Sequence, residues 1–278
     1  MKELAKRISV ALWGIPLLLY LTYEGGYFFA LFTLIVNGMA LWEFYRMFEN
    51  QQIFAHKILG TILSSVFLVA TFFYPEIWNF GVIATIALLL LAHLQVQKGL
   101  ASTNTVYTIS GFVYITLLLS ALLNLRLAFA DWSRAYVMSD AHIGGYFVIV
   151  FFASIWICDT AAYFGGRLMG KHKLAPNVSP NKTIEGAAFG FIFGIISFWG
   201  LATVLVPEMR VEYALVSGAI VGVFGQIGDL IESRFKRDAG VKDTSALLPG
   251  HGGFFDRFDS IIFVSPFLWT LFKFQLLG

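Results

Sequence analysis

Charged residues and cysteine are both scarce in this chain. Only 13% of its 278 residues are charged, whereas about a quarter are charged in soluble proteins. Cys158 is the single cysteine, which excludes an internal disulfide and a metal site built from several cysteines. The net charge is only +2 and the basic residues form no stripe, so nucleic acid is not an expected partner.

Apolar residues make up 58% of the chain and fall in long runs. We therefore predict an all-α, polytopic integral membrane protein in which residues 1–278 form a single membrane domain. Nine runs are long enough to cross about 30 Å of hydrocarbon as helices. They cover residues 8–24, 27–47, 57–74, 78–96, 105–129, 144–168, 185–206, 212–233 and 257–276.

The distribution of basic residues predicts the orientation of these spans. Nine crossings place the two ends of the chain on opposite sides of the membrane. Fifteen of the nineteen lysines and arginines fall in segments on the amino-terminal side, and basic segments tend to face the cytoplasm. We therefore expect the amino terminus and the charged segments after the sixth and eighth spans to be cytoplasmic.

Glycine is concentrated in the second half of the chain, where eighteen of the 26 glycines follow residue 140. Within 186–194 and 218–222 a glycine recurs every four residues, and this spacing allows helices to pack backbone to backbone in lipid. We expect residues 144–278 to form catalytic helices and cytoplasmic loops. We expect residues 1–143 to be scaffold helices that contact lipid or a second copy of the chain in a homodimer.

The segment 233–259 is the most polar stretch of the chain and reads SRFKRDAGVKDTSALLPGHGGFFDRFD. Lysine and arginine can meet phosphate oxygens, carboxylates can hold Mg²⁺, and glycine allows backbone amides to approach an anion closely. A charge run at a membrane face is often only a solvated loop. Here the charges flank the turn-forming run 248–253, and Asp256 and Asp259 share one face if a helix starts there. This mixture favours a phosphate and metal site.

The same segment resembles the phosphatidate cytidylyltransferases, also called CDP-diacylglycerol synthases, at many fixed positions. The resemblance implies an integral membrane enzyme that condenses CTP with phosphatidic acid in the bilayer. It also implies that pyrophosphate and CDP-diacylglycerol are released and that Mg²⁺ is required. The matching positions are Ser233, Phe235, Lys236, Arg237, Lys242, Asp243, Ser245, Leu248, Pro249, His251, Gly252, Gly253, Phe254, Asp256, Arg257, Phe258 and Asp259.

Residues 159–186 resemble a second block of the same family. Asp159 is followed by small and aromatic residues and then by the pattern Ser-Pro-x-Lys-Thr-x-Glu-Gly. A lysine and free amides at a helix amino terminus form a ready phosphate site, which makes Lys182 a candidate ligand of CTP. The predicted nucleotide-binding residues are Asp159, Ser179, Lys182, Thr183, Lys236 and Arg237.

Structural roles are the alternatives for part of this block. Asp159 could form an ion pair with Arg167, two helical turns further along the chain. Thr183 and Glu185 lie at the start of the seventh span, where helix capping would account for both.

Two aspartates near the ends of the last two spans predict a metal site. Asp229 lies within the eighth span, where a carboxylate needs a partner. Asp256, at the head of the ninth span, reaches it if the intervening loop folds back. Two converging carboxylates repel one another without a cation, and Mg²⁺ with oxygen ligands supplies the missing charge. We therefore predict that Asp229, Asp256 and Asp259 bind Mg²⁺.

The predicted catalytic residues are Asp229, Asp256, Lys242, His251 and Arg257. The basic residues would neutralise phosphate charge. His251 would donate a hydrogen bond to phosphate or act as a general acid, because hard Mg²⁺ prefers oxygen ligands. A structural role is the alternative for this loop histidine.

These residues predict an in-line nucleotidyl transfer from CTP to phosphatidic acid at the cytoplasmic rim of the bilayer. A CTP-dependent kinase that phosphorylates polyprenol or a similar lipid could use the same charges. A membrane transporter would also place acids such as Asp159 and Asp229 inside the membrane, although its expected inverted repeat is not evident.

Overall fold

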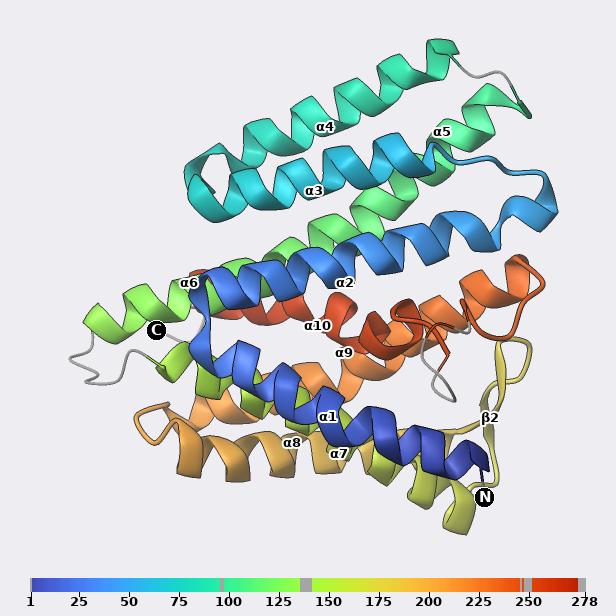
Figure 1. The fold of residues 1–278 in the computed structure, drawn as a ribbon. Coiled ribbons are helices and arrows are strands. Elements are labelled where there is room, and N and C mark those ends of the chain that lie inside the picture. The colour runs from blue at the N-terminus through green and yellow to red at the C-terminus, as the bar shows by residue number, and fades with distance from the viewer. Residues whose placement is uncertain (1, 96–97, 136–141, 246, 248–251, 275–278) are drawn as a thin grey trace. The chain divides into compact units, whose positions relative to one another are not determined.

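The computed structural model describes residues 2–95, 98–135, 142–245, 247 and 252–274 (Figure 1). Most of these residues are helical, which confirms the predicted class. Each predicted apolar run lies largely on a helix or on consecutive helices. The helices are α1 (Lys2–Glu24), α2 (Gly26–Met47), α3 (Lys57–Phe73), α4 (Trp78–Ala92), α5 (Ala101–Gly111), the π-helix η4 (Phe112–Leu117), α6 (Leu118–Ala135), α7 (Ile143–Met169), α8 (Ile184–Leu205), α9 (Val211–Asp238) and α10 (Phe255–Lys273).

Six helical segments among the described residues are long and apolar enough to cross a membrane. The chain is therefore an integral membrane protein. The count of nine spans and the side on which the amino terminus lies stay predictions. The six segments are Gly26–Gln51, Pro75–Gln95, Ala101–Leu127, Ile143–Met169, Ile184–Leu205 and Val211–Asp238.

A short antiparallel hairpin between α7 and α8 is not predicted by the sequence analysis. Its strands are β1 (Lys173–Ala175) and β2 (Ser179–Thr183). Pro176 and Asn177 lie in the connecting turn, where both residue types are favoured, and the Val178 amide donates to the Ala175 carbonyl at 3.1 Å. Strands of three and five residues are too short to produce a clear alternation of apolar and polar residues.

The chain forms two compact units. Unit 1 comprises Met1–Leu17, Tyr27–Asn124 and Phe235–Phe258, and unit 2 comprises Leu18–Gly26, Leu125–Arg234 and Asp259–Gly278. Each unit therefore combines segments from both halves of the chain. The boundary near residue 143 between scaffold and catalytic helices stays a prediction.

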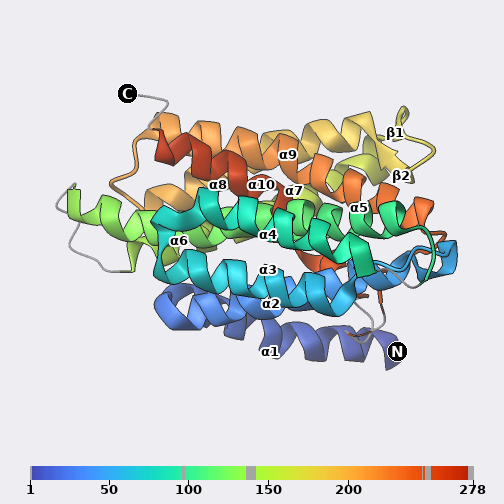
Figure 2. The same ribbon diagram turned by 90° about the horizontal axis from the view of Figure 1, so that it is seen from above.

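In unit 1, α3 and α4 lie side by side (Figures 1 and 2). Their shared core is an apolar cluster in which Phe67, Leu68, Leu89 and Phe112 are buried. Removing this apolar surface from contact with lipid or water requires close side-chain packing. The rings of Phe67 and Phe112 meet edge to face, with centroids 5.3 Å apart.

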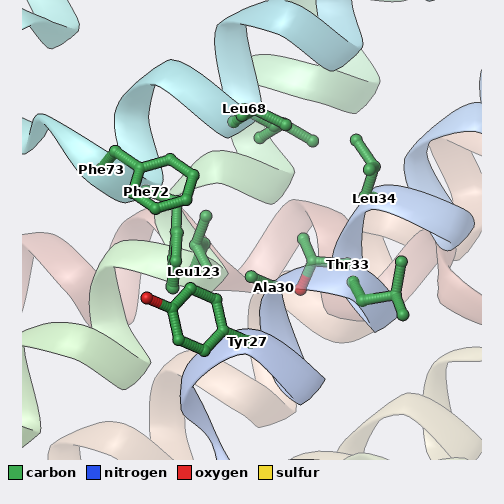
Figure 3. Close-up of a pocket in the computed structure, with 10 residues that line it drawn as sticks. Tyr27, Ala30, Thr33, Leu34, Leu68, Phe72, Phe73 and Leu123 are labelled. Carbon is green, nitrogen blue, oxygen red and sulfur yellow. The ribbon is translucent and has the colours of Figure 1, made fainter.

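An apolar groove of about 170 Å³ lies on unit 1 between residues of α2, α3 and α6 (Figure 3). Tyr27 and Phe72 face one another across it, with ring centroids 5.5 Å apart. Tyr27, Leu31 and Phe73 remain largely exposed. Exposed apolar side chains of this kind suit helices that are surrounded by lipid.

In unit 2, glycines bring the backbones of α8 and α9 into close contact. An added Cβ at Gly194 would lie 3.0 Å from the Cα of Gly222, and one at Gly218 would lie 2.6 Å from the Cα of Ile195. At Gly186 an added Cβ would lie 2.6 Å from the carbonyl oxygen of Ala162 on α7. These contacts confirm the predicted backbone-to-backbone packing.

Candidate active site

The approach of α9 and α10 in unit 2 depends on glycine. At Gly228 of α9 an added Cβ would lie 2.8 Å from the Cβ of Phe263 and 3.1 Å from the carbonyl oxygen of Asp259, both on α10. One turn earlier, the hydroxyl of Ser260 donates to the carbonyl of Gly225 at 3.0 Å. The two helices therefore nearly touch beside Asp229.

This approach gathers three carboxylates, which we call the carboxylate cluster: Asp229, Glu232 and Asp259. One oxygen from each lies within 4.8 Å of the others. Glu232 and Asp259 are 1% and 9% exposed, so water screens their charges poorly. Buried like charges repel one another unless a cation or protons compensate, and several carboxylate oxygens are a suitable donor set for Mg²⁺. The residues present therefore fit a divalent cation.

A lysine from the hairpin meets the carboxylate cluster. Lys182 of β2 donates from Nζ to Oδ2 of Asp229 at 2.6 Å, and both side chains remain partly exposed. The hydroxyl of Ser233, one turn further along α9, donates to Oδ1 of Asp229 at 3.2 Å. Asp229 is thus the member of the cluster that joins the hairpin to α9 within unit 2.

The hairpin is fixed by polar contacts at the start of α8. The hydroxyl of Thr183 accepts a hydrogen bond from the Gly186 amide at 3.1 Å, so Thr183 is the N-cap of α8, the structural alternative to its predicted nucleotide binding. Glu185 instead reaches back to the two residues before β1. Its carboxylate accepts from the amides of Lys171 and His172 and lies 2.6 Å from Nδ1 of His172. Both contacts hold β2, and therefore Lys182, at the start of α8.

In unit 1, Asp256 has several hydrogen-bond donors around it. Its Oδ1 accepts from Nζ of Lys236 at 2.7 Å, and the side chain of Asp256 is only 4% exposed. Its Oδ2 accepts from the amide and hydroxyl of Thr244 at 3.0 and 2.9 Å and from the Gly253 amide at 2.8 Å. Charge-assisted hydrogen bonds to this carboxylate therefore hold Lys236, Thr244 and Gly253 near the start of α10.

A second buried carboxylate of unit 1, Glu43 of α2, was missed by the sequence analysis. It is 4% exposed and accepts hydrogen bonds from Thr244, Ser245, Phe254 and Phe255. An acidic residue inside the predicted span 27–47 was the available indication, because ionisable residues in membrane helices are costly without partners.

The remaining predicted residues are spread over several elements. Asp159 is exposed on α7, while its proposed partner Arg167 donates to the hydroxyl of Tyr163 at 3.3 Å. Ser179 is half-buried at the start of β2. Arg237, Lys242 and Arg257 are exposed, and His251 lies outside the described residues.

The predicted metal ligands are only partly brought together. Asp229 and Asp259 meet in the carboxylate cluster of unit 2, and their third partner there is Glu232. Glu232 is not among the predicted metal ligands. Asp256 belongs to unit 1, so its sharing of a cation with Asp229 stays a prediction.

Carboxylates on apolar helices, with a lysine of the hairpin beside them, fit the class of integral membrane proteins that bind cations and phosphate groups. Comparison with known proteins identifies the family. The model of the cytidylyltransferase family matches residues 5–275, so the chain belongs to this family.

Two bacterial relatives illustrate how far the similarity extends. The chain is 34% identical over 281 residues to the phosphatidate cytidylyltransferase of Bacillus subtilis strain 168, covering 98% of each chain. It is 37% identical over 201 residues to the phosphatidate cytidylyltransferase of Staphylococcus haemolyticus strain JCSC1435, covering 68% of this chain and 77% of the relative.

Proposed function

We propose that this protein is a phosphatidate cytidylyltransferase, which uses CTP and phosphatidic acid to make CDP-diacylglycerol and pyrophosphate. The Bacillus subtilis relative, which matches nearly the whole chain and is named a phosphatidate cytidylyltransferase, supports this assignment, as does the family match over residues 5–275. Within the structure, the ion pair of 2.6 Å between Lys182 and Asp229 carries the proposal. It joins Lys182, a lysine of the second block suited to phosphate, to Asp229 of α9, an aspartate suited to a cation.

The reaction needs little covalent chemistry from the protein. A phosphate oxygen of phosphatidic acid attacks the α-phosphorus of CTP, and a new P–O bond forms. The bond from the α-phosphorus to the oxygen that bridges to the β-phosphorus breaks, so pyrophosphate leaves with the electron pair. Because the attacking phosphate oxygen is ionised at neutral pH, no strong general base is required.

The main task of the side chains is to position two anionic substrates. Lys182 already carries its charge beside the carboxylate cluster, and it can bind a phosphate oxygen of CTP while Asp229 orients its ammonium. We propose Ser179, Thr183, Lys236, Arg237, Lys242, His251 and Arg257 as further groups that hold or polarise phosphate, and Asp159 as a carboxylate of the nucleotide-binding site.

We propose that Asp229, Glu232 and Asp259 hold Mg²⁺, with Asp256 as a predicted ligand to be tested separately. When bound, Mg²⁺ supplies positive charge for the phosphates of CTP and for the departing pyrophosphate. The proximity of the three cluster oxygens supports this assignment.

A test of the reaction uses purified protein in detergent with phosphatidic acid, Mg²⁺ and CTP that is labelled at either the α- or the γ-phosphorus. The proposed enzyme transfers the α-label to the lipid fraction and releases the γ-label as pyrophosphate. A CTP-dependent lipid kinase would do the reverse. Label in neither product, together with transport of a solute in liposomes, would favour a transporter.

We also propose that the hairpin and the carboxylate cluster face the cytoplasm, where CTP is found. In a Cys158→Ala background, a Lys173→Cys variant would be labelled by a membrane-impermeant maleimide in inverted vesicles and not in intact cells. Labelling in intact cells would place the hairpin outside. A homodimer stays a prediction, and the mass of the detergent-solubilised protein tests it.

A further inference from the structure

Glu43 is a buried carboxylate on α2, within the candidate membrane span Gly26–Gln51. Such a group is costly in an apolar environment unless hydrogen-bond donors surround it. The proposed reaction assigns Glu43 no role, but its hydrogen bonds indicate a role in holding the backbone near Asp256.

The four donors to Glu43 come from two short segments, 244–245 and 253–255, which we call the loop ends. On one side the hydroxyls of Thr244 and Ser245 donate at 3.1 and 2.6 Å. On the other side the amides of Phe254 and Phe255 donate at 3.1 and 2.8 Å. Each carboxylate oxygen accepts one bond from each loop end, so Glu43 ties the two ends together.

Asp256 ties the same loop ends a second time. Its Oδ2 accepts from the Thr244 amide and from the Gly253 amide, and the Thr244 hydroxyl lies between Asp256 and Glu43. Gly253 is required at this point, because an added Cβ would lie 2.2 Å from Oγ1 of Thr244 and 2.4 Å from Oε2 of Glu43. Two carboxylates therefore share one closely packed set of donors.

The residue after Glu43 anchors the neighbouring helix ends by apolar packing. The ring of Phe44 meets Phe255, at the start of α10, edge to face at 6.0 Å. It meets Phe235, near the end of α9, at 5.3 Å in the same manner. Consecutive residues of α2 thus hold the loop ends by polar and by aromatic contacts.

We infer that Glu43 is a positioning residue for the proposed reaction. By fixing the loop ends, it sets the start of α10 and therefore the placement of Asp256 and Arg257. Its effect on turnover rests on the proposed function, whereas its effect on the loop ends is independent of any reaction.

Glu43→Gln tests this role with little change of shape. The side-chain amide nitrogen cannot accept, so two of the four bonds to Glu43 are lost and a donor faces donors. Hydrogen exchange of a peptide that contains the Phe254 and Phe255 amides should become about tenfold faster or more, as expected when bonds to a charged group are lost. The KM for CTP should rise by about tenfold. If the variant were only partly unfolded, the apparent kcat would fall without a change in KM. A higher KM therefore indicates displaced loop ends and not partial unfolding.

Glu49→Gln is the matched control. Glu49 also belongs to unit 1 and forms an ion pair, but its partner, Lys57, is on α3 and is not part of the loop ends. This variant should leave both the exchange of the loop ends and the KM for CTP unchanged.

Ser245→Ala removes a donor to Glu43 from the loop side, and it replaces Glu43→Gln as the test if that variant does not fold. It should show the same two effects at smaller size, and the loss in the double variant should be smaller than the sum of the two single losses, because both substitutions act on the same group of contacts. Unchanged exchange in both variants would overturn the inference. Faster exchange with an unchanged KM would also overturn the positioning role. If the unmodified protein makes no labelled lipid, the proposed function fails, while the exchange measurements still decide whether Glu43 holds the loop ends.

Discussion

The two units treat their carboxylates in opposite ways. In unit 2, Asp229, Glu232 and Asp259 lie with their oxygens within 4.8 Å of one another. In unit 1, seven donor groups surround Glu43 and Asp256: four backbone amides, two hydroxyls and a lysine. Carboxylates that gather together suit a cation, whereas carboxylates that gather donors suit the fixing of a backbone.

This difference separates two tasks that adjoin in the sequence. Asp256 and Asp259 are three residues apart on α10. Asp256 nevertheless accepts hydrogen bonds in unit 1, whereas Asp259 belongs to the carboxylate cluster of unit 2. Spacing along a helix predicts a shared face, but the surrounding segments determine what each carboxylate binds. Substitutions in the two groups should therefore have different signatures.

The largest expected effect follows from Asp229→Asn. This change removes a charged oxygen from the carboxylate cluster and weakens the hold on Lys182, so turnover of CTP should fall roughly 100- to 1000-fold. Lipid product from α-labelled CTP measures the loss, at several concentrations of Mg²⁺. Asp238→Asn, an exposed aspartate at the end of α9, is the control and should remain near normal. Near-normal activity in Asp229→Asn would remove it from the site.

Asp256→Asn tests whether Asp256 of unit 1 holds the loop ends or binds the cation. If Asp256 mainly holds the loop ends, the variant should show faster hydrogen exchange there and a loss of activity of about tenfold that excess Mg²⁺ does not restore. If Asp256 binds the cation, raising Mg²⁺ should recover activity while the exchange stays unchanged.

Lys182→Met should raise the KM for CTP by about tenfold to 100-fold, because the proposed charge-assisted contact with phosphate would be lost. Lys173→Met is the control, since Lys173 is exposed on the facing strand of the same hairpin. An unchanged KM in Lys182→Met would contradict the assigned role.

Gly228→Ala should separate α9 from α10 beside the carboxylate cluster. An added Cβ would lie 2.8 Å from the Cβ of Phe263 and 3.2 Å from the Cα of Ser260, and relieving such overlap costs about 1–3 kcal/mol. The melting temperature in detergent and the Mg²⁺ concentration for half-maximal activity should both change. Gly225→Ala is the matched control, because the nearest atom to its added Cβ, on Val264, is 3.9 Å away. Equal behaviour of both variants would show that the close approach has no influence on the cluster.

The smallest expected effect concerns unit 1 alone. Burial, with a contribution from the nearby His93, lowers the pKa of His56 below its usual value of 6.5. The unfolded chain then binds a proton more readily than the folded chain as the pH falls below 6.5, so His56 should make the protein less stable in mild acid. In His56→Gln the decrease in melting temperature between pH 7 and pH 5 should be smaller by about 2 °C or less. An unchanged decrease would exclude this contribution.

The sequence predicted the features that depend on residues close to one another. Long apolar runs gave the helices, and the glycine spacing gave the contact of α8 with α9, because both depend on local periodicity. The cap at Thr183 followed from its position directly before an apolar run. Asp229 and Asp259 were assigned to a metal site from their charge and their places near helix ends.

The features that were missed depend on contacts between distant residues. Glu43 and its partner Thr244 are 201 residues apart, and no local pattern relates them. Glu232 entered the carboxylate cluster only because α10 approaches α9 at Gly228. The hairpin that carries Lys182 is too short for a periodic pattern. In each case the missing information was which segments pack together.

Manganese binding followed by electron paramagnetic resonance tests the central claim most directly, with Mn²⁺ in place of Mg²⁺ because both prefer oxygen ligands. The account predicts that the unmodified protein and Asp238→Asn bind Mn²⁺ alike. It predicts that Asp229→Asn and Glu232→Gln each lose that binding. Equal Mn²⁺ binding by all four proteins would show that the carboxylate cluster does not hold the cation.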